Sequence, residues 1–463
     1  MTKTIELISP VDGRVYAERQ CADAIQLENA LDAATTAQAQ WKCRPLSERA
    51  AFCSAAVDAM LAMKDEIVPE LAWQMGRPVR YCAGELRGFE ERARHMIAIA
   101  PQALADVEPA PINGFRRYIK REPLGTILVI APWNYPYLTA VNSIIPALMA
   151  GNSVILKHAS QTLLVGERFA EAFRRAKLPE GLFQNLVLDH AQTGAIIGGG
   201  RVQQVNFTGS VAAGKAMENA ATGQFMGMGL ELGGKDPAYV RADANLDYAV
   251  ENLVDGSFFN SGQSCCAVER IYVDANIYPT FIERFAALTR QYVLGNPLDE
   301  ATTLGPLVNA GAADFVRGQI TDALKMGARA LIGPQDFAAD VPGSAYLAPQ
   351  VLVDVSHGMS VMRDESFGPV VGIMPVTGDE QAIALMNDSE FGLSASIWTA
   401  DLAAAEHLGN RIDTGTLFMN RCDYLDPALA WTGVKHSGRG VTLSRLGYEH
   451  LTRAKSFHLR HEI

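Results

Sequence analysis

Short apolar runs alternate with longer helical segments along much of the chain, beginning at Thr126. The first run, Thr126–Ala131, reads TILVIA, a continuous stretch typical of a strand buried on both faces. Residues 137–150 then indicate a helix that Gly151 ends. Four more strands follow between helical segments, at residues 153–156, 184–188, 202–207 and 229–232. Strand–helix–strand units of this length connect in the right-handed sense, so they predict a parallel, doubly wound sheet.

A second strand–helix series follows Cys265, whereas the first hundred residues read as helices. The second series has strands at 271–273, 351–355, 370–373 and 395–398 and a helix at 279–293; the early helices are at 27–41, 47–63 and 85–105. We therefore expect an α/β fold with a Rossmann-like cofactor domain, residues 1–106 and 124–232, and a second α/β catalytic domain, residues 233–432. Ligands of such sheets bind at the carboxyl ends of the strands, so the site should lie in the cleft that the domains share.

Charge and composition argue against several classes of protein. The net charge of −11 over 463 residues disfavours a nucleic-acid partner, because binding phosphates requires clustered Lys and Arg. No apolar run reaches the roughly eighteen residues needed to cross a bilayer, and no signal peptide begins the sequence. We therefore expect a cytoplasmic protein without a membrane partner. The seven cysteines are irregularly spaced and predict neither a disulfide framework nor a metal site.

A glycine-rich turn partly matches a P-loop. Residues 209–215, GSVAAGK, fit its first seven positions, but Ala216 stands where a Ser or Thr would hold Mg²⁺. The sequence therefore lacks the side chain that would bind Mg²⁺ in a nucleoside triphosphatase, which argues against that function. A strand ending at Phe207 and a helix beginning near Val211 remain. The N–H groups at the start of such a helix can bind an anion such as a pyrophosphate, although a purely structural turn is equally compatible with the pattern.

Six segments, taken in order, resemble motifs of the aldehyde dehydrogenase superfamily. They are 132–136 (PWNYP), 207–210 (FTGS), 230–235 (LELGGK), 259–265 (FNSGQSC), 365–369 (ESFGP) and 433–438 (GVKHSG). One such motif would be a weak signal, but six in the family's order across most of the chain are specific.

The resemblance implies thiol chemistry at Cys265. A nucleophile must form a tetrahedral adduct with the aldehyde before hydride can leave, and a thiolate suits this task. The side chain of Asn134 and the backbone N–H of Cys265 would form an oxyanion hole. Glu231 would act as the general base for the water that hydrolyses the thioester. Cys266 is interpreted as a bystander, because neighbouring side chains point apart.

The resemblance also implies NADP or NAD as the cofactor. Lys157 would bind the adenosine ribose region, and Ser160 replaces a glutamate that often repels a 2′-phosphate in the family. The loss of that negative charge predicts that NADP is accepted. Glu365 and Phe367 resemble the residues that hold the nicotinamide ribose and ring. The other predicted cofactor contacts are Trp133, Gly209, Ser210, Gly214 and Leu232.

The aldehyde itself is less constrained by the sequence. Arg421 could pair with a distal carboxylate, which favours a semialdehyde such as succinate semialdehyde, whereas Tyr424 and Trp431 also suit an aromatic aldehyde. An aliphatic substrate, transfer of the acyl group to coenzyme A, and an inactive binding or structural homologue are the alternatives. The other pocket candidates are Tyr135, Thr139, Asn142 and Ser264.

Two segments resemble the oligomerisation strands of the family. They lie within residues 107–123 and 441–463, at 115–121 and 455–459. A small β arm built from them predicts a homodimer or a homotetramer.

Overall fold

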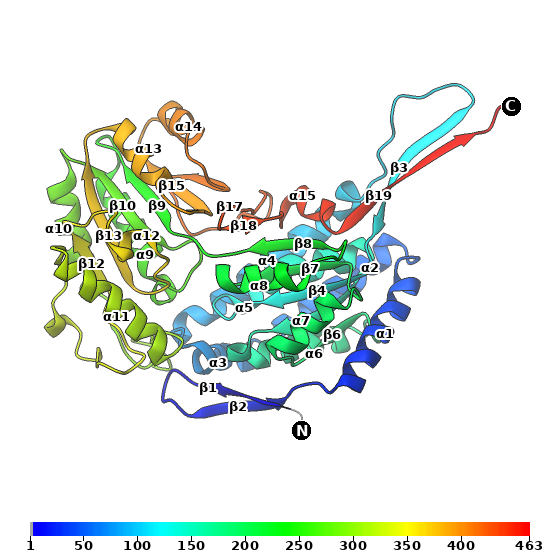
Figure 1. The fold of residues 1–463 in the computed structure, drawn as a ribbon, viewed down its shortest axis with the longest axis horizontal. Coiled ribbons are helices and arrows are strands. Elements are labelled where there is room, and N and C mark those ends of the chain that lie inside the picture. The colour runs from blue at the N-terminus through cyan, green and yellow to red at the C-terminus, as the bar shows by residue number, and fades with distance from the viewer. Residues whose placement is uncertain (1–2) are drawn as a thin grey trace.

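The computed structural model describes residues 3–463, and its first lobe is built on a six-stranded sheet (Figure 1). The strand order is β18-β8-β7-β4-β5-β6, and only the β18–β8 pair is antiparallel. The chain runs outward from β4 to β6 and then returns to the other side of β4, so the doubly wound topology is confirmed. The strands are β4 (Thr126–Ala131), β5 (Ser153–His158), β6 (Phe183–Asn185), β7 (Gln204–Thr208), β8 (Gly227–Glu231) and β18 (Gly438–Arg439).

Helices cover both faces of this sheet because its central strand is apolar on both sides. Ile127 and Val129 of β4 pack into the core formed with α2 to α6, and Leu128 and Ile130 pack into the core formed with α1, α7 and α8. The helices are α1 (Ala24–Trp41), α2 (Leu46–Leu61), α3 (Lys64–Met75), α4 (Val79–Ala103), α5 (Pro136–Ala150), α6 (Leu163–Arg175), α7 (His190–Gly198) and α8 (Val211–Ala220).

The second lobe is built on a seven-stranded sheet, which lies at the left of Figure 1. Its order is β11-β12-β13-β10-β9-β15-β16, parallel except between β11 and β12. The strands are β9 (Asp236–Val240), β10 (Val268–Asp274), β11 (Arg329–Ala330), β12 (Gln350–Val353), β13 (Val370–Val376), β15 (Ser394–Trp398) and β16 (Thr416–Met419), with β14 (Phe391–Gly392) pairing β17 (Val434–Lys435) apart from them. The helices are α9 (Leu246–Phe258), α10 (Tyr278–Thr289), α11 (Ala310–Lys325), α12 (Ser360–Arg363), α13 (Asp379–Asn387) and α14 (Leu402–Gly409).

A two-stranded arm projects from the first lobe (Figure 1). Strand β3 (Phe115–Pro123) pairs antiparallel with β19 (Thr452–Arg460) along its whole length. The ring of Tyr118 stacks on that of Phe457 at 4.5 Å between centroids. The short helix α15 (Ser444–Glu449) precedes β19, and Tyr448 anchors it by donating a hydrogen bond of 2.6 Å to the main-chain oxygen of Met96.

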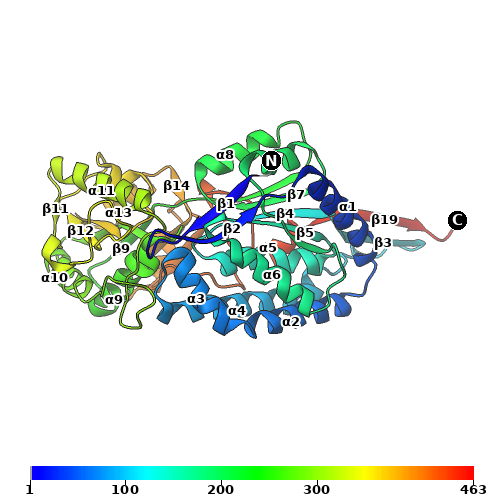
Figure 2. The same cartoon turned by 90° about the horizontal axis from the view of Figure 1, so that it is seen from below.

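The N-terminal region departs from the helical prediction. Before α1, strands β1 (Thr4–Ile8) and β2 (Val15–Gln20) form a hairpin that lies across the molecule in Figure 2. It contacts the first lobe through the stacked rings of Tyr16 and Trp73, 5.7 Å apart, and the second lobe through a hydrogen bond from Tyr346 to the carbonyl of Val11. The hairpin is mostly exposed, so its sequence carries little of the apolar alternation that identifies a strand.

Strand β9 was also missed, although it lies inside the second sheet between β10 and β15. It contains Pro237, and a proline usually argues against a central strand because it cannot donate to the ladder. The register between β9 and β10 shifts at this point, where Pro237 lies opposite Arg270. The irregular pairing accommodates the missing N–H group.

The α/β fold class is confirmed, whereas the exact domain boundaries stay a prediction. Strand β18, near the end of the chain, returns to the first sheet beside β8. Among residues 3–463, no helix is long and apolar enough to cross a membrane. The same residues contain no cluster of three or more His, Cys, Asp or Glu side chains arranged to hold a metal ion.

Candidate active site

The predicted site residues lie at the carboxyl edge of the first sheet. The order in which successive strands are added reverses between β4 and β7. Ligands of doubly wound sheets bind at such a switch point. Asn134 follows β4, Gly209 and Ser210 follow β7, and Glu231 is the last residue of β8. Three stretches that are distant in the sequence thereby reach one edge.

A tight loop presents Cys265 to this edge. Helix α9 ends at Phe258, and the next residues have left-handed backbone angles, with φ of 53° at Asn260 and 58° at Ser261. Such angles are costly outside glycine and occur often at functional sites. A Cβ at Gly262 would lie 2.3 Å from the main-chain oxygen of Gly368. Only glycine therefore allows the loop to pack here and to carry Cys265 into the cleft.

Cys265 and Glu231 line the same cavity, of about 330 Å³. Its wall comes from α4, α5, α9, the cysteine loop and the 422–431 segment. Five of the predicted substrate residues are part of that wall: Tyr135, Thr139, Ser264, Tyr424 and Trp431.

Two threonine hydroxyls hold the carboxylate of Glu231. Thr208 donates to Oε2 at 3.0 Å, and Thr442 donates to Oε1 at 2.5 Å. Burial raises the pKa of Glu231, while both hydrogen bonds and the charge of Arg92 lower it. The net effect is upward, so Glu231 is a stronger base than an exposed carboxylate.

Asn134 is buried and directed at the cysteine loop. Its Nδ2 donates to the main-chain oxygen of Gln263 at 3.2 Å. Its own main-chain oxygen accepts hydrogen bonds from Arg77 and from Nδ2 of Asn260, the latter at 3.2 Å. Arg77 in turn forms a buried ion pair with Glu85, whose carboxylate accepts the first N–H groups of α5. This polar network fixes Asn134 against the loop that carries Cys265.

The two residues predicted to hold the nicotinamide, Glu365 and Phe367, lie together with Trp133, another predicted cofactor contact. The rings of Trp133 and Phe367 meet edge to face at 5.7 Å. Oε1 of Glu365 accepts a hydrogen bond of 3.0 Å from the backbone of Gly234, and burial raises the pKa of Glu365 to about 7. The segment is anchored by Glu269, which accepts the N–H of Phe367 at 2.9 Å.

The remaining predicted cofactor residues lie on β5, on α8 and after β8. Lys157 is on β5, where burial lowers its pKa, and Ser160 is exposed at the start of the short 3₁₀ helix Ser160–Thr162. Ser210 caps α8 by accepting the N–H of Ala213 at 3.3 Å. Gly214 packs so closely on Leu232 that a Cβ would lie 2.7 Å from it.

His158 links the end of β5 to the segment that carries Asn134. Its Nε2 lies 3.3 Å from the main-chain oxygen of Pro136, and its Nδ1 lies 3.0 Å from the hydroxyl of Thr162. Burial lowers the pKa of His158 to about 4, so the ring is neutral at physiological pH. Its role is to join β5 to the start of α5.

The structure does not bring Arg421 into the cavity wall. This residue is exposed, and its guanidinium stacks over the ring of Tyr424 at 3.4 Å. The cation that lines the cavity is Arg92, on α4. Asn142 is also absent from the wall; its Oδ1 instead accepts a hydrogen bond from Arg92 at 3.4 Å.

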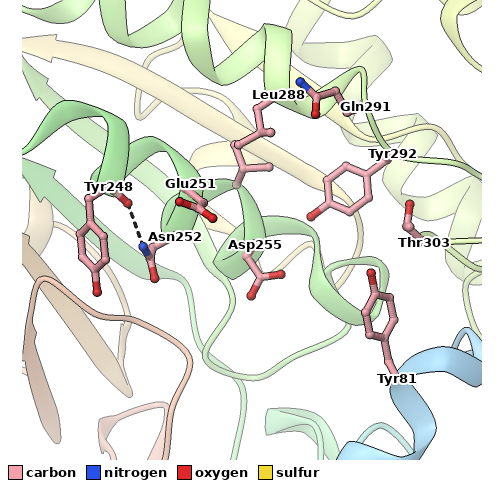
Figure 3. A pocket seen from close by; sticks show the side chains of 10 residues that line it. Tyr81, Tyr248, Glu251, Asn252, Asp255, Leu288, Gln291, Tyr292 and Thr303 are labelled. Atoms are coloured by element: carbon pink, nitrogen blue, oxygen red, sulfur yellow. Dashed lines mark hydrogen bonds between the residues drawn. The ribbon is translucent and has the colours of Figure 1, made fainter.

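A second cavity, of about 510 Å³, adjoins the first and shares Asn252 and Asp255 with it (Figure 3). Glu251 and Asp255 both come from α9, and Tyr81 and Tyr292 lie on the other side of the space. Burial and the neighbouring carboxylates raise the pKa of Asp255 to about 6. Two carboxyl groups, those of Glu251 and Asp255, therefore line the second cavity.

Comparison with known proteins identifies the family. A family model described as "Aldehyde dehydrogenase family" matches residues 1–457. The chain belongs to the aldehyde dehydrogenase family.

Individual aldehyde dehydrogenases match over nearly their whole length. The chain is 34% identical to succinate semialdehyde dehydrogenase [NAD(P)+] Sad of Escherichia coli (strain K12), over 95% of this chain and 94% of that protein. It is 33% identical to betaine aldehyde dehydrogenase 1 of Rhizobium meliloti (strain 1021), over 98% and 93%. The solved structure of succinic semialdehyde dehydrogenase from Streptococcus pyogenes, in complex with NADP+, superposes with a TM-score of 0.93 at 28% identity and covers 98% of this chain and 100% of that one.

The sequence did not predict several residues that support this aldehyde dehydrogenase site. Arg77 and Glu85 lie far from the motifs in sequence, whereas Thr442 follows the 433–438 motif closely but lies far from Glu231. Only the fold brings these residues to Asn134 and Glu231. The α4 helix contains several arginines, and their spacing alone does not reveal that Arg92 faces the cavity.

Proposed function

We propose that this aldehyde dehydrogenase oxidises an aldehyde to its carboxylic acid through a covalent intermediate on Cys265. The observation that carries the proposal is the single cavity lined by both Cys265 and Glu231. A nucleophile and a general base beside one enclosed space can act in turn on the same substrate carbon.

In the first step, the Cys265 thiolate adds to the carbonyl carbon. A C–S bond forms, and negative charge develops on the former carbonyl oxygen. We assign the backbone N–H of Cys265 and the Nδ2 group of Asn134 as donors to that oxygen, because Nδ2 is already directed at the cysteine loop. Loss of one such donor typically costs about 2.7–4 kcal/mol of transition-state stabilisation.

When bound, NADP or NAD supplies the acceptor for the hydride that leaves this adduct. Oε2 of Glu365 accepts no hydrogen bond within residues 3–463, which leaves an acceptor for a ribose hydroxyl. Trp133 and Phe367 would enclose the ring, and the N–H groups at the start of α8, after Gly209 and Ser210, would bind the pyrophosphate. The residues present therefore fit the cofactor.

In the second step, Glu231 takes a proton from water as the water oxygen attacks the thioester on Cys265. The C–S bond then breaks, the thiolate is restored and the carboxylic acid is released. The raised pKa of Glu231 suits a general base that works near neutral pH. Its place in the cavity wall supports hydrolysis over transfer of the acyl group to coenzyme A.

The substrate that we propose is a semialdehyde such as succinate semialdehyde. Relatives that bear this name support the proposal, and Arg92 supplies a cation in the cavity wall. Tyr424 and Trp431 also line the cavity, so an aromatic aldehyde is the second candidate. Ser160 is exposed and lies shortly after Lys157 of β5, and these two residues support acceptance of NADP in addition to NAD.

The oligomer that we propose is a homodimer or a homotetramer assembled through the β3–β19 arm. A lone two-stranded sheet is marginally stable in water. The arm projects from the lobe with most of β19 exposed, as expected of strands that a second subunit covers.

Replacing Cys265 tests the mechanism, with Cys266 as the matched control. We expect Cys265→Ala to abolish formation of reduced nicotinamide. Cys266→Ala should retain most turnover, because the Cys266 thiol lines the same cavity but donates its hydrogen bond to Asp423. Persistent dehydrogenase turnover in folded Cys265→Ala protein would refute the mechanism.

A further inference from the structure

Arg92 is a buried cation in the wall of the cavity that holds Cys265. Its side chain comes from α4, and only 9% of the residue is exposed. The Nη1 group donates to the main-chain oxygen of Leu138 at 2.8 Å and to Oδ1 of Asn142 at 3.4 Å. Within residues 3–463, its Nε and Nη2 groups make no hydrogen bond and no carboxylate forms an ion pair with it.

Within residues 3–463, the two other buried arginines each form hydrogen bonds through all three side-chain nitrogens. Arg77 uses Nε, Nη1 and Nη2 to bond Asn260, Glu85 and Asn134. Arg270 bonds protein oxygens through the same three nitrogens. A buried charge without partners is costly, so proteins normally pair it or surround it with acceptors. Arg92 differs from both, and its side chain is part of the wall of the cavity that holds Cys265.

We propose that Arg92 binds a carboxylate at the far end of the aldehyde, and so selects short ω-oxo carboxylates. A guanidinium can hold a carboxylate with two parallel hydrogen bonds, for which Arg92 has both Nε and Nη2 available. Cys265 lines the same cavity, so one short molecule can reach the arginine with one end and the thiol with the other. This inference rests on the proposed function, and it assigns to Arg92 the role that the sequence suggested for Arg421.

Asn142 keeps Arg92 in place without neutralising it. Its Oδ1 accepts from Arg92, which leaves its Nδ2 buried without a partner. An amide at this position therefore supports the guanidinium yet preserves its net positive charge. A carboxylate at the same position would pair with Arg92 and compete with the substrate.

The acidic residues around the two cavities point to the main competing occupant. Glu91, Glu231, Asp255 and Asp423 line the same cavity as Arg92, and Glu251 lies in the second cavity (Figure 3). They could attract an aldehyde with a cationic end. Glu231 and Asp423 already accept hydrogen bonds from side chains of the protein. Glu91 and Asp255 keep more contact with solvent than Arg92, which is buried, and charge pairs strengthen as water is excluded. We therefore assign the specificity to Arg92.

The test compares three aldehydes of equal length, ending in a carboxylate, a neutral amide or a quaternary ammonium. The measured quantity is kcat/KM at saturating cofactor, for the wild type and for Arg92→Gln, Asn142→Asp and Arg421→Gln. Arg94→Gln is the matched control, since Arg94 lies on the same helix but pairs with Asp58 and Glu90 on the surface.

We expect the wild type to prefer the carboxylate aldehyde, and Arg92→Gln to reduce its advantage over the amide aldehyde by roughly 100-fold. Asn142→Asp should reduce it in the same direction, which covers the case in which Arg92→Gln does not fold. Arg94→Gln and Arg421→Gln should preserve it. An unchanged preference in folded Arg92→Gln, a collapse in Arg421→Gln, or a wild-type preference for the ammonium aldehyde would overturn the proposal.

Binding of succinate to Cys265→Ala protein separates this inference from the proposed function. Succinate carries carboxylates but no aldehyde, so calorimetry reports on the anion site without turnover. Weaker binding upon adding Arg92→Gln would support the anion site even if no aldehyde is oxidised. Equal binding in the presence and absence of Arg92 would contradict it, even if the enzyme oxidises neutral aldehydes.

Discussion

Thr442 donates a hydrogen bond to the Glu231 carboxylate across 211 positions of sequence. The contact joins the last residue of β8 to the segment that leads into α15 and the arm. It favours the ionised form of Glu231 and lowers its pKa against the larger, opposite effect of burial. The strength of the proposed base therefore depends on a residue near the end of the chain.

Replacing Thr442 with Val should move the acidic limb of the pH–rate profile to higher pH. The variant loses a hydrogen bond to the charged form of Glu231, so the pKa of this carboxyl group rises further. A base with a higher pKa is protonated at higher pH, and thioester hydrolysis slows there. Steady-state kcat across the pH range measures the shift.

Thr377→Val is the control for that experiment, because its hydroxyl bonds only Gln381 on an exposed turn. This variant should keep the wild-type profile. If Thr442→Val also leaves the acidic limb in place while hydrolysis limits the rate, then Glu231 is not the base.

The sequence predicted the parts of the structure that depend on local pattern. The β4 strand was predicted to the residue because all its side chains are buried and all those after Thr126 are apolar. The motif around Glu231 and the motif around Cys265 are each a continuous stretch of sequence, so the sequence alone could indicate their chemistry. Thr442 could not be connected with Glu231 in this way, because the contact exists only after β18 pairs with β8.

The misplaced carboxylate anchor has a related cause. Arg421 lies near predicted pocket residues in sequence, yet its side chain stacks on Tyr424 outside the cavity wall. Arg92 belongs to a long helix whose orientation is fixed by its packing on α5. Helical spacing shows which residues share a face of α4, but not which end of that face meets the cleft.

Ser160→Glu should shift cofactor preference from NADP toward NAD. The new carboxylate would stand where we expect the 2′-phosphate, and two like charges repel. We expect kcat/KM with NADP to fall roughly tenfold relative to NAD, a modest effect because Ser160 is exposed and screened. Initial rates with each cofactor measure the ratio.

The control for Ser160→Glu is Ser356→Glu, which adds the same charge to an exposed position of the second lobe. It should leave the NADP to NAD ratio unchanged. A Ser160→Glu variant with the wild-type ratio would place the 2′-phosphate away from this residue.

His158→Gln should reduce the loss of stability that accompanies acidification. The folded-state pKa of His158 is about 4, below the model-peptide value of about 6.5, so the unfolded chain binds the extra proton first. Stability from the neutral ring is complete above about pH 6.5 and falls as the pH drops toward 4. Between about pH 7.5 and pH 5 the wild type should lose roughly 2 kcal/mol more than the variant.

Urea unfolding at the two pH values measures this difference. His190→Gln is the matched control, since His190 is exposed at the start of α7, and it should keep the wild-type dependence on pH. Equal acid sensitivity of the wild type and His158→Gln would mean that the ring binds its proton as readily in the folded protein as in the unfolded chain.

Removing residues 453–463 should convert the oligomer into smaller species. The deletion takes away nearly all of β19, leaves β3 without its partner and removes the Tyr118–Phe457 stacking. Tyr448, which anchors α15 to the first lobe, remains, so the lobes should stay folded. Light scattering at micromolar concentration measures the mass, and circular dichroism checks the fold. A full-length chain that is already monomeric, or a truncated chain that keeps the full-length mass, would show that the arm does not hold subunits together.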